Sequence, residues 1–130
     1  MYCLFCKIIN KEIPAKVIFE NEAAIAVLDI HPCAPGHTVV LPKHHTPALI
    51  ELTDEHVGPV FLVVKEVAKK LKNVLKYDGL TIGINQGRKA GQEIDHLHIH
   101  LIPRWGNDGG GSVQSVVNNQ TKKDISKLWN

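Results

Sequence analysis

The hydrophobic and polar positions change their spacing along the chain, and these changes divide it into short strands and one long helix. Short apolar runs bounded by Pro, Gly and Asn predict strands at 16–20, 24–28, 37–41, 80–85 and 97–102. Between the third and fourth runs, apolar residues recur at helical spacing, which predicts an amphipathic helix that begins at Thr53 or Asp54 and ends at Asp78–Gly79. Its core-facing stripe comprises Val57, Val60, Phe61, Val64, Val67, Ala68, Leu71 and Leu75. Strands with one inserted helix favour an α+β domain with an antiparallel sheet.

The composition of the chain limits the classes of protein to which it can belong. The chain has 130 residues, of which 44% are hydrophobic and 22% charged, so one compact domain with one core accounts for it. Its net charge of +2 comes from scattered lysines, without the dense basic run that is typical of nucleic-acid binding. No apolar stretch has the length of a membrane span, and the N-terminus lacks the pattern of a signal peptide. We therefore expect a cytoplasmic protein that binds neither nucleic acid nor membranes.

The composition changes near Gly106, where a Gly- and Asn-rich stretch begins that resists packing. We therefore expect a domain over residues 1–105 and a C-terminal tail over residues 106–130, which is mobile or depends on a partner.

The three cysteines suggest metal binding rather than a disulfide framework. Their number is odd, and Cys3 and Cys6 form a C-x-x-C pair, which fits a reducing compartment and a metal clip. A closed tetrahedral site needs two more ligands, most simply two histidines. The alternative is that both are small packed hydrophobic residues. Cys33 is expected to be a free, packed thiol.

The stretch His96-Leu97-His98-Ile99-His100 carries the strongest chemical signal. Side chains alternate between the two faces of a strand, so the three imidazoles share one face while Leu97, Ile99 and Leu101 share the other. Such a wall of imidazoles is reactive or binds metal. The preceding loop, residues 85–93, contains two glycines, so its backbone amides can approach an anion closely. A phosphate held there would lie near imidazoles able to attack it.

The run from His96 to Ile102 resembles the signature of the histidine triad family. Further resemblance to this family, and to its Hint branch, lies in the segments 3–9, 28–30 and 35–43, in Asn85 and in Gly91-Gln92, in family order across residues 1 to about 105. The resemblance implies a HIT-like fold, with a five-stranded antiparallel sheet, one long helix and a short N-terminal helix, and a homodimer. It also implies binding of purine nucleotides, such as AMP or GMP derivatives. Family members cleave phosphoramidates, nucleotidyl adducts and dinucleoside polyphosphates at the α-phosphate.

The resemblance assigns catalytic roles to four histidines. His98 is the nucleophile that attacks the α-phosphorus and forms a nucleotidyl-histidine, which water then resolves. His96 resembles the residue that supports it, and His100 the residue that hydrogen-bonds phosphate oxygens. His37 either supports the triad, as its family counterpart does, or merely lines the sheet.

The resemblance also assigns substrate contacts. Asp29 resembles the carboxylate that binds the ribose hydroxyls, although it could be only a turn residue before Pro32. The backbone amides of Gln92 and Glu93 would receive the developing negative charge. The remaining contacts are an apolar slot for the base and further phosphate or leaving-group contacts: Phe5, Ile8, Val27 and Ile30 for the base, and Asn85, Gly91 and the Gln92 side chain for the phosphate.

Zinc-bearing bacterial members of the family pair the N-terminal cysteines with two histidines. The resemblance therefore implies a structural Zn²⁺ held by Cys3, Cys6, His45 and His96, which leaves His98 free as nucleophile.

The chain departs from many relatives at Glu93, where they carry a hydroxyl residue. Its carboxylate would repel phosphate, so it could instead face a cationic leaving group such as an amine. Two other functions remain open: a metallohydrolase whose histidines hold a catalytic metal, and a nucleotide-responsive binding protein whose catalysis is incidental.

Overall fold

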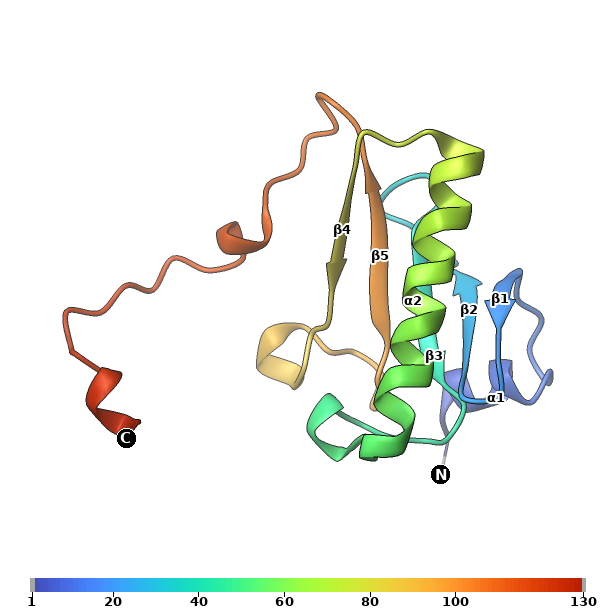
Figure 1. The fold of residues 1–130 in the computed structure, drawn as a ribbon, viewed down its shortest axis with the longest axis horizontal. Helices are drawn as coiled ribbons and strands as arrows, with labels where there is room; N and C mark the ends of the chain where they lie inside the picture. Colours follow the sequence, from blue (N-terminus) through green and yellow to red (C-terminus); the bar gives the residue numbers. More distant parts are fainter. Residues whose placement is uncertain (1, 130) are drawn as a thin grey trace.

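A computed structural model describes residues 2–129 (Figure 1). The elements follow in the order α1 (Leu4–Ile9), β1 (Val17–Glu20), β2 (Ala24–Leu28), β3 (Thr38–Pro42), α2 (Asp54–Leu75), β4 (Gly79–Gly83) and β5 (Ile99–Arg104). Four short 3₁₀ turns lie at Leu49–Glu51, Arg88–Ala90, Val113–Ser115 and Ser126–Leu128. The strands form one antiparallel sheet in the order β1-β2-β3-β5-β4. The predicted fold class is confirmed, because the sheet, the long helix and the short N-terminal helix are all present.

The sheet separates two apolar clusters. Helix α2 lies across one face, and α1 lies on the other side near β1 (Figure 1). Alternation along β2 sends Ala24 and Ala26 toward α2, while Ile25 and Val27 pack with α1. Among residues 2–129, no helix combines the length and apolarity of a membrane span.

The predicted stripe of α2 is partly wrong. Val60, Val64, Val67 and Leu71 are buried as expected, but Val57 and Phe61 are 38% and 37% exposed. Val57 lies in the first turn of α2, most of which is exposed. Phe61 follows buried Val60 directly, so its side chain points about 100° away around the helix axis. Val63, which the stripe omitted, is fully buried.

The histidine segment is less regular than predicted. Strand β5 begins at Ile99, so His96 and His98 precede the strand, and the amide of Leu97 donates to the Thr46 carbonyl at 2.6 Å instead of to a neighbouring strand. The alternation nevertheless persists, because Leu97, Ile99 and Leu101 lie in the cluster beneath α2. The imidazoles of His96 and His98 contact Phe5 of α1 on the opposite face. The three histidines therefore share the face that was predicted.

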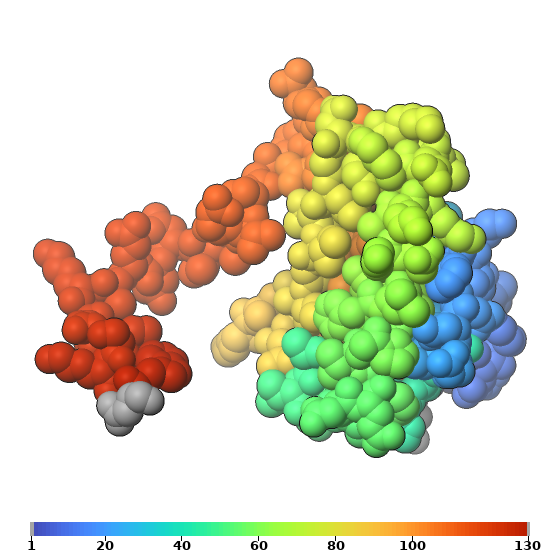
Figure 2. Space-filling model, viewed as in Figure 1, coloured from blue at the N-terminus to red at the C-terminus, as the bar shows by residue number. Residues whose placement is uncertain are grey.

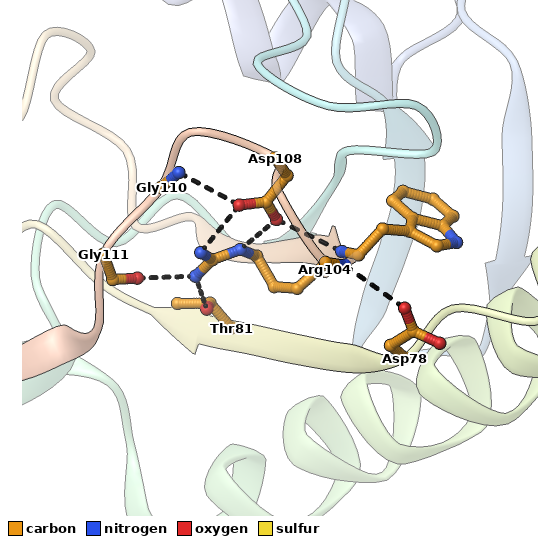
Figure 3. Close-up of polar contacts among 8 residues, drawn as sticks. Asp78, Thr81, Arg104, Asp108, Gly110 and Gly111 are labelled. Carbon is orange, nitrogen blue, oxygen red and sulfur yellow. Dashed lines mark hydrogen bonds and ion pairs between the residues drawn. The ribbon is translucent and has the colours of Figure 1, made fainter.

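The segment that follows β5 is fixed to the sheet by Arg104. Its guanidinium pairs with both oxygens of Asp108, at 2.7 and 3.1 Å, and also donates to Thr81 of β4 and to the carbonyl of Gly111 (Figure 3). The beginning of the Gly-rich stretch is thus hydrogen-bonded to the sheet edge, although we expected it to resist packing. Beyond it the chain stands apart from the body, with exposed side chains (Figure 2).

Candidate functional site

The ring of His98 is held in one tautomer. Its Nδ1 lies 2.8 Å from the backbone carbonyl oxygen of His96, which can only accept, so Nδ1 carries the proton. In the neutral ring, Nε2 is then the nitrogen with the free lone pair. The edge of the ring packs on Phe5, with centroids 4.9 Å apart, and the residue is 9% exposed. The side chain therefore presents an oriented nucleophilic nitrogen.

A chain of hydrogen bonds orients His100 in the opposite sense. The Cys33 amide donates to Nδ1 of His37 at 3.2 Å, so His37 carries its proton on Nε2. That nitrogen lies 2.9 Å from Nδ1 of His100 and donates to it. His100 in turn carries its proton on Nε2, the one buried side-chain N or O atom among residues 2–129 without a hydrogen-bond partner. The relay therefore ends in an N–H that awaits an acceptor, beside a His98 ring with its centroid 4.9 Å away.

Burial keeps this relay neutral. It lowers the pKa of His100 to about 4, with further lowering by His98 and His37, while Asp29 opposes the shift. Burial also lowers the pKa of His37, again against the effect of Asp29. Near pH 7 both rings are uncharged, so each donates one proton and accepts another.

Asp29 serves the turn that carries it and also faces the relay. Its Oδ1 accepts the His31 amide at 2.8 Å, while Oδ2 lies 3.6 Å from Nε2 of His37. The turn role, considered as an alternative from the sequence, is therefore present. The ribose role stays a prediction.

Three of the four predicted slot residues come together. Phe5, Ile8 and Val27 are buried in one cluster between α1 and the sheet. Ile30 lies outside it and is 67% exposed. Because Val27 is almost completely buried, it supports this wall from behind.

Gln92 stabilises the loop before the histidines with its side chain. Nε2 donates to the carbonyls of Pro47 at 2.8 Å and Ile94 at 3.0 Å, and Oε1 accepts the Gly87 amide at 2.8 Å. Both amide hydrogens have acceptors within the protein, so the side chain has no free N–H for a phosphate in this structure, and its phosphate contact stays a prediction. The backbone amide of Gln92 donates to the Gly87 carbonyl at 3.1 Å.

The other predicted residues of this loop lie at its surface. Asn85 is exposed, and its side chain lies close to Gly91, which adopts a φ of 102° that favours glycine. Glu93 is exposed and accepts a hydrogen bond from Arg88 through its carbonyl. The exposure of Glu93 is consistent with the expected repulsion between its carboxylate and a phosphate.

Cys33, expected to be packed, is free but exposed. Its amide, which orients His37, could not be found from the sequence because every residue except proline carries the same donor.

The predicted metal ligands converge. Nδ1 of His96 lies 3.5 Å from Sγ of Cys3, 3.6 Å from Sγ of Cys6 and 3.2 Å from Nδ1 of His45, and Sγ of Cys6 lies 3.3 Å from the same nitrogen of His45. All four ligand atoms lie within 4.8 Å of one another. A zinc tetrahedron with ordinary bond lengths has edges of about 3.3 Å between nitrogens and about 3.6 Å between nitrogen and sulfur. The four residues fit zinc.

The donor pattern of this cluster also suits a cation. Nε2 of His96 donates to the Pro42 carbonyl at 2.8 Å, which leaves a lone pair on the inward Nδ1. Burial lowers the pKa of His96 to about 4, so that lone pair stays unprotonated near pH 7. Burial and Cys3 raise the pKa of Cys6 to about 11, so its thiolate forms readily only beside a cation.

Asp29, His37 and His100 form a second group whose polar atoms lie within 4.8 Å of one another. Here the one close pair of histidine nitrogens, Nε2 of His37 and Nδ1 of His100, joins a donor to an acceptor, because the Cys33 amide sets the tautomer of His37. This pair needs no cation between its nitrogens.

Comparison with known proteins agrees with this geometry. The HIT domain family matches residues 10–107. An uncharacterized HIT-like protein of Methanocaldococcus jannaschii, MJ0866, is 45% identical over 127 residues, which cover 95% of this chain and 98% of that protein. The adenosine 5'-monophosphoramidase HNT1 of Saccharomyces cerevisiae is 40% identical over 102 residues, covering 78% of this chain and 62% of that protein.

Solved structures match over the same domain. A HIT family protein of Bacillus subtilis is 41% identical, with a TM-score of 0.82, and the match covers 87% of this chain and 81% of that one. A Zn-bound histidine triad family protein of Mycobacterium smegmatis is 38% identical, with a TM-score of 0.78, and the match covers 84% of this chain and 79% of that one. The resemblance identified in the sequence is therefore confirmed: this chain belongs to the HIT family.

Proposed function

We propose that this chain is an enzyme that binds a purine nucleotide and cleaves it at the α-phosphate through a nucleotidyl intermediate on His98. The observation that carries the proposal is the pair of opposite tautomers. Nε2 of His98 has a free lone pair, while the neighbouring Nε2–H of His100 is buried without an acceptor. A phosphate supplies both an electrophilic phosphorus and an acceptor oxygen. The name of the yeast relative, adenosine 5'-monophosphoramidase, supports this class of substrate.

The chemistry follows from these two rings. The Nε2 lone pair of His98 attacks the α-phosphorus, and the bond from phosphorus to the leaving group breaks. The leaving group departs with the electron pair and takes up a proton from solvent. The hydrogen bond from Nδ1–H of His98 to the carbonyl of His96 stabilises the cationic ring of the intermediate. Water then attacks the phosphorus, and its oxygen bonds there as the bond to His98 breaks. Its proton passes to solvent, and the neutral ring is restored.

The developing negative charge falls on the phosphate oxygens. In this mechanism one oxygen accepts from Nε2–H of His100, and another faces the backbone amide of Glu93, since the Gln92 amide already donates to the Gly87 carbonyl. Since His37 holds His100 in the donating tautomer, no proton has to move before the reaction begins.

The remaining contacts follow the predicted subsites. Asp29 would bind the ribose hydroxyls through its Oδ2, because Oδ1 is already bonded to the His31 amide. The base would lie against the wall formed by Phe5 and Ile8. Glu93, at the exposed end of the loop, would favour a cationic leaving group such as a lysine amine.

Zinc in this account is structural. Cys3, Cys6, His45 and His96 would hold Zn²⁺, which fixes α1 to the segment that precedes β5. A solved relative from Mycobacterium smegmatis is described as Zn-bound, which supports the metal. Because His96 supplies both a ligand nitrogen and the carbonyl that orients His98, the metal would stabilise the nucleophile indirectly.

A homodimer is part of the proposal. Strand β4 lies at the edge of the sheet and pairs only with β5 in this chain. Ile82 on β4 and three residues of α2, Val57, Phe61 and Leu62, leave large apolar side chains exposed. An open strand edge and uncovered apolar side chains favour association with a second copy.

The test is turnover of adenosine 5'-phosphoramidate. We expect His98→Asn to lower kcat at least about 10³-fold, because no other described group replaces the nucleophile. The matched control is His44→Asn, which changes an exposed histidine and should stay within about twofold of wild type. The proposal fails if wild type releases no AMP, or if His98→Asn keeps a tenth of the rate.

A further inference from the structure

An open groove lies on the α2 side of the sheet, away from the zinc ligands. It has a volume of about 630 Å³ and runs between β1, the end of β2 and the last turns of α2. In the face shown in Figure 2, the blue N-terminal segment and the green helix adjoin. A volume of this size suits a small organic ligand, since such sites commonly measure about 300 to 1,000 Å³.

The walls of this groove are mainly aliphatic. Ile18 and Leu28 line it from the sheet, and Leu71 and Val74 line it from the helix. Val74 is 78% exposed, so its side chain is uncovered in this structure. Contiguous aliphatic walls with an uncovered residue are suited to an alkyl chain.

Two lysines give the groove a positive charge. Lys16 and Lys70 both line it, and neither forms an ion pair among residues 2–129. Lys70 donates to the carbonyl of Ile18 at 3.3 Å, which places its ammonium over β1. A lysine ammonium is a compact point charge that pairs with an anionic group such as a carboxylate. The charge of the groove therefore complements an anionic head group.

The groove adjoins the loop of the candidate site. Leu28 and Gly36 line it, and their neighbours in sequence are Asp29 and His37. Gly36 adopts a φ of 81°, and a side chain there would collide with Leu75 at the end of α2. A ligand in the groove would thus touch the loop that positions His37.

From the aliphatic walls and the two ammonium groups without an ion pair, we propose that this groove binds a single-chain amphiphile with an anionic head, such as a medium-chain fatty acid. The alkyl chain lies between Leu28 and Leu71, and the carboxylate lies between Lys16 and Lys70. This site is separate from the proposed nucleotide site, so it can be tested without any assay of turnover.

The test is calorimetric titration of the full chain with decanoate and, separately, with decyltrimethylammonium, both below their micellar concentrations. We expect saturable binding of decanoate and binding at least about tenfold weaker of the cation, because the chain length is shared and only the head charge differs. Lys16→Glu combined with Lys70→Glu should weaken decanoate binding about tenfold or more. Lys16→Arg combined with Lys70→Arg should keep it.

The matched control is Lys69→Glu, which reverses an exposed charge beside Lys70 that does not line the groove. This variant should bind decanoate within about twofold of wild type. Thermal melts of each variant identify any that fails to fold. The proposal is overturned if wild type does not bind decanoate, if both head groups bind equally, or if the double reversal leaves affinity unchanged. Binding only to anionic vesicles, or loss of the groove in a dimer, would also overturn it.

Discussion

His37 should act on the reaction through the tautomer of His100. Replacing it with leucine removes the donor that lies 2.9 Å from Nδ1 of His100. A neutral hydrogen bond of this kind contributes about 1 kcal/mol, which corresponds to about a fivefold change in rate. The released ring also divides its proton between two nitrogens, and only one of these tautomers donates to phosphate, which adds a factor of about two. We therefore expect His37→Leu to lower kcat about tenfold.

The assay is steady-state turnover of adenosine 5'-phosphoramidate near pH 7, with kcat and KM measured separately. His37→Gln offers an amide N–H in place of the ring N–H and should recover most of the loss. His31→Leu, in the same loop, removes an exposed ring whose backbone amide still bonds Asp29, and it should match wild type. His37 does not hold the tautomer of His100 if the kcat of His37→Leu stays within twofold of wild type, or if the glutamine variant is no faster than the leucine variant.

Three further results are expected, each with its own control. Cys3→Ser should reduce bound zinc, measured by atomic absorption, well below one ion per chain and lower Tm by several degrees. The control Cys33→Ser, at an exposed cysteine, should leave both the zinc content and Tm unchanged. The pKa of His100 is lowered from 6.5 to about 4, so the folded state binds fewer protons than the unfolded state between these values, and stability is lost as pH falls through this window. For this residue the free energy of unfolding falls by about 2 kcal/mol between about pH 7.5 and about pH 5. In urea unfolding, the stability of His100→Gln should fall by that much less than wild type over the same range. An equal dependence of stability on pH in both proteins would contradict this. Gln92→Leu removes three hydrogen bonds and should destabilise the chain by about 2 to 3 kcal/mol in the same unfolding assay. The control Gln86→Leu removes one exposed hydrogen bond and should destabilise it by less than about 1 kcal/mol. Similar losses of stability in both variants would show that the loop does not depend on Gln92.

The sequence predicts an element well where the spacing of its apolar residues matches the spacing of its buried side chains. The alternation through Leu97, Ile99 and Leu101 placed the imidazoles on one face, even though regular pairing begins only at Ile99. The stripe of α2 was less reliable because spacing alone does not show how far the helix overlaps the sheet. Phe61 is therefore exposed, and Val63 is buried.

The candidate site likewise contains residues that the sequence could predict and contacts that it could not. Chemically distinctive side chains could be predicted, which is why the four metal ligands converge as expected. The hydrogen-bond partners of the site histidines are mostly backbone groups, such as the carbonyls of His96 and Pro42. These partners could not be predicted from the sequence, because every residue carries a backbone carbonyl. Gln92 illustrates the limit, because an amide in a Gly-rich loop can face a ligand or the loop itself, and here it bonds the loop.

The proposed mechanism depends on a covalent bond between Nε2 of His98 and the α-phosphorus of the substrate. The most direct measurement is the intact mass of the chain after millisecond mixing with adenosine 5'-phosphoramidate and a quench that avoids acid, followed by peptide mapping. We expect one added nucleotidyl group on His98 in wild type, which appears and decays at rates compatible with turnover and is absent from His98→Asn. Turnover without any adduct, or an adduct on His100 or another histidine, would contradict it.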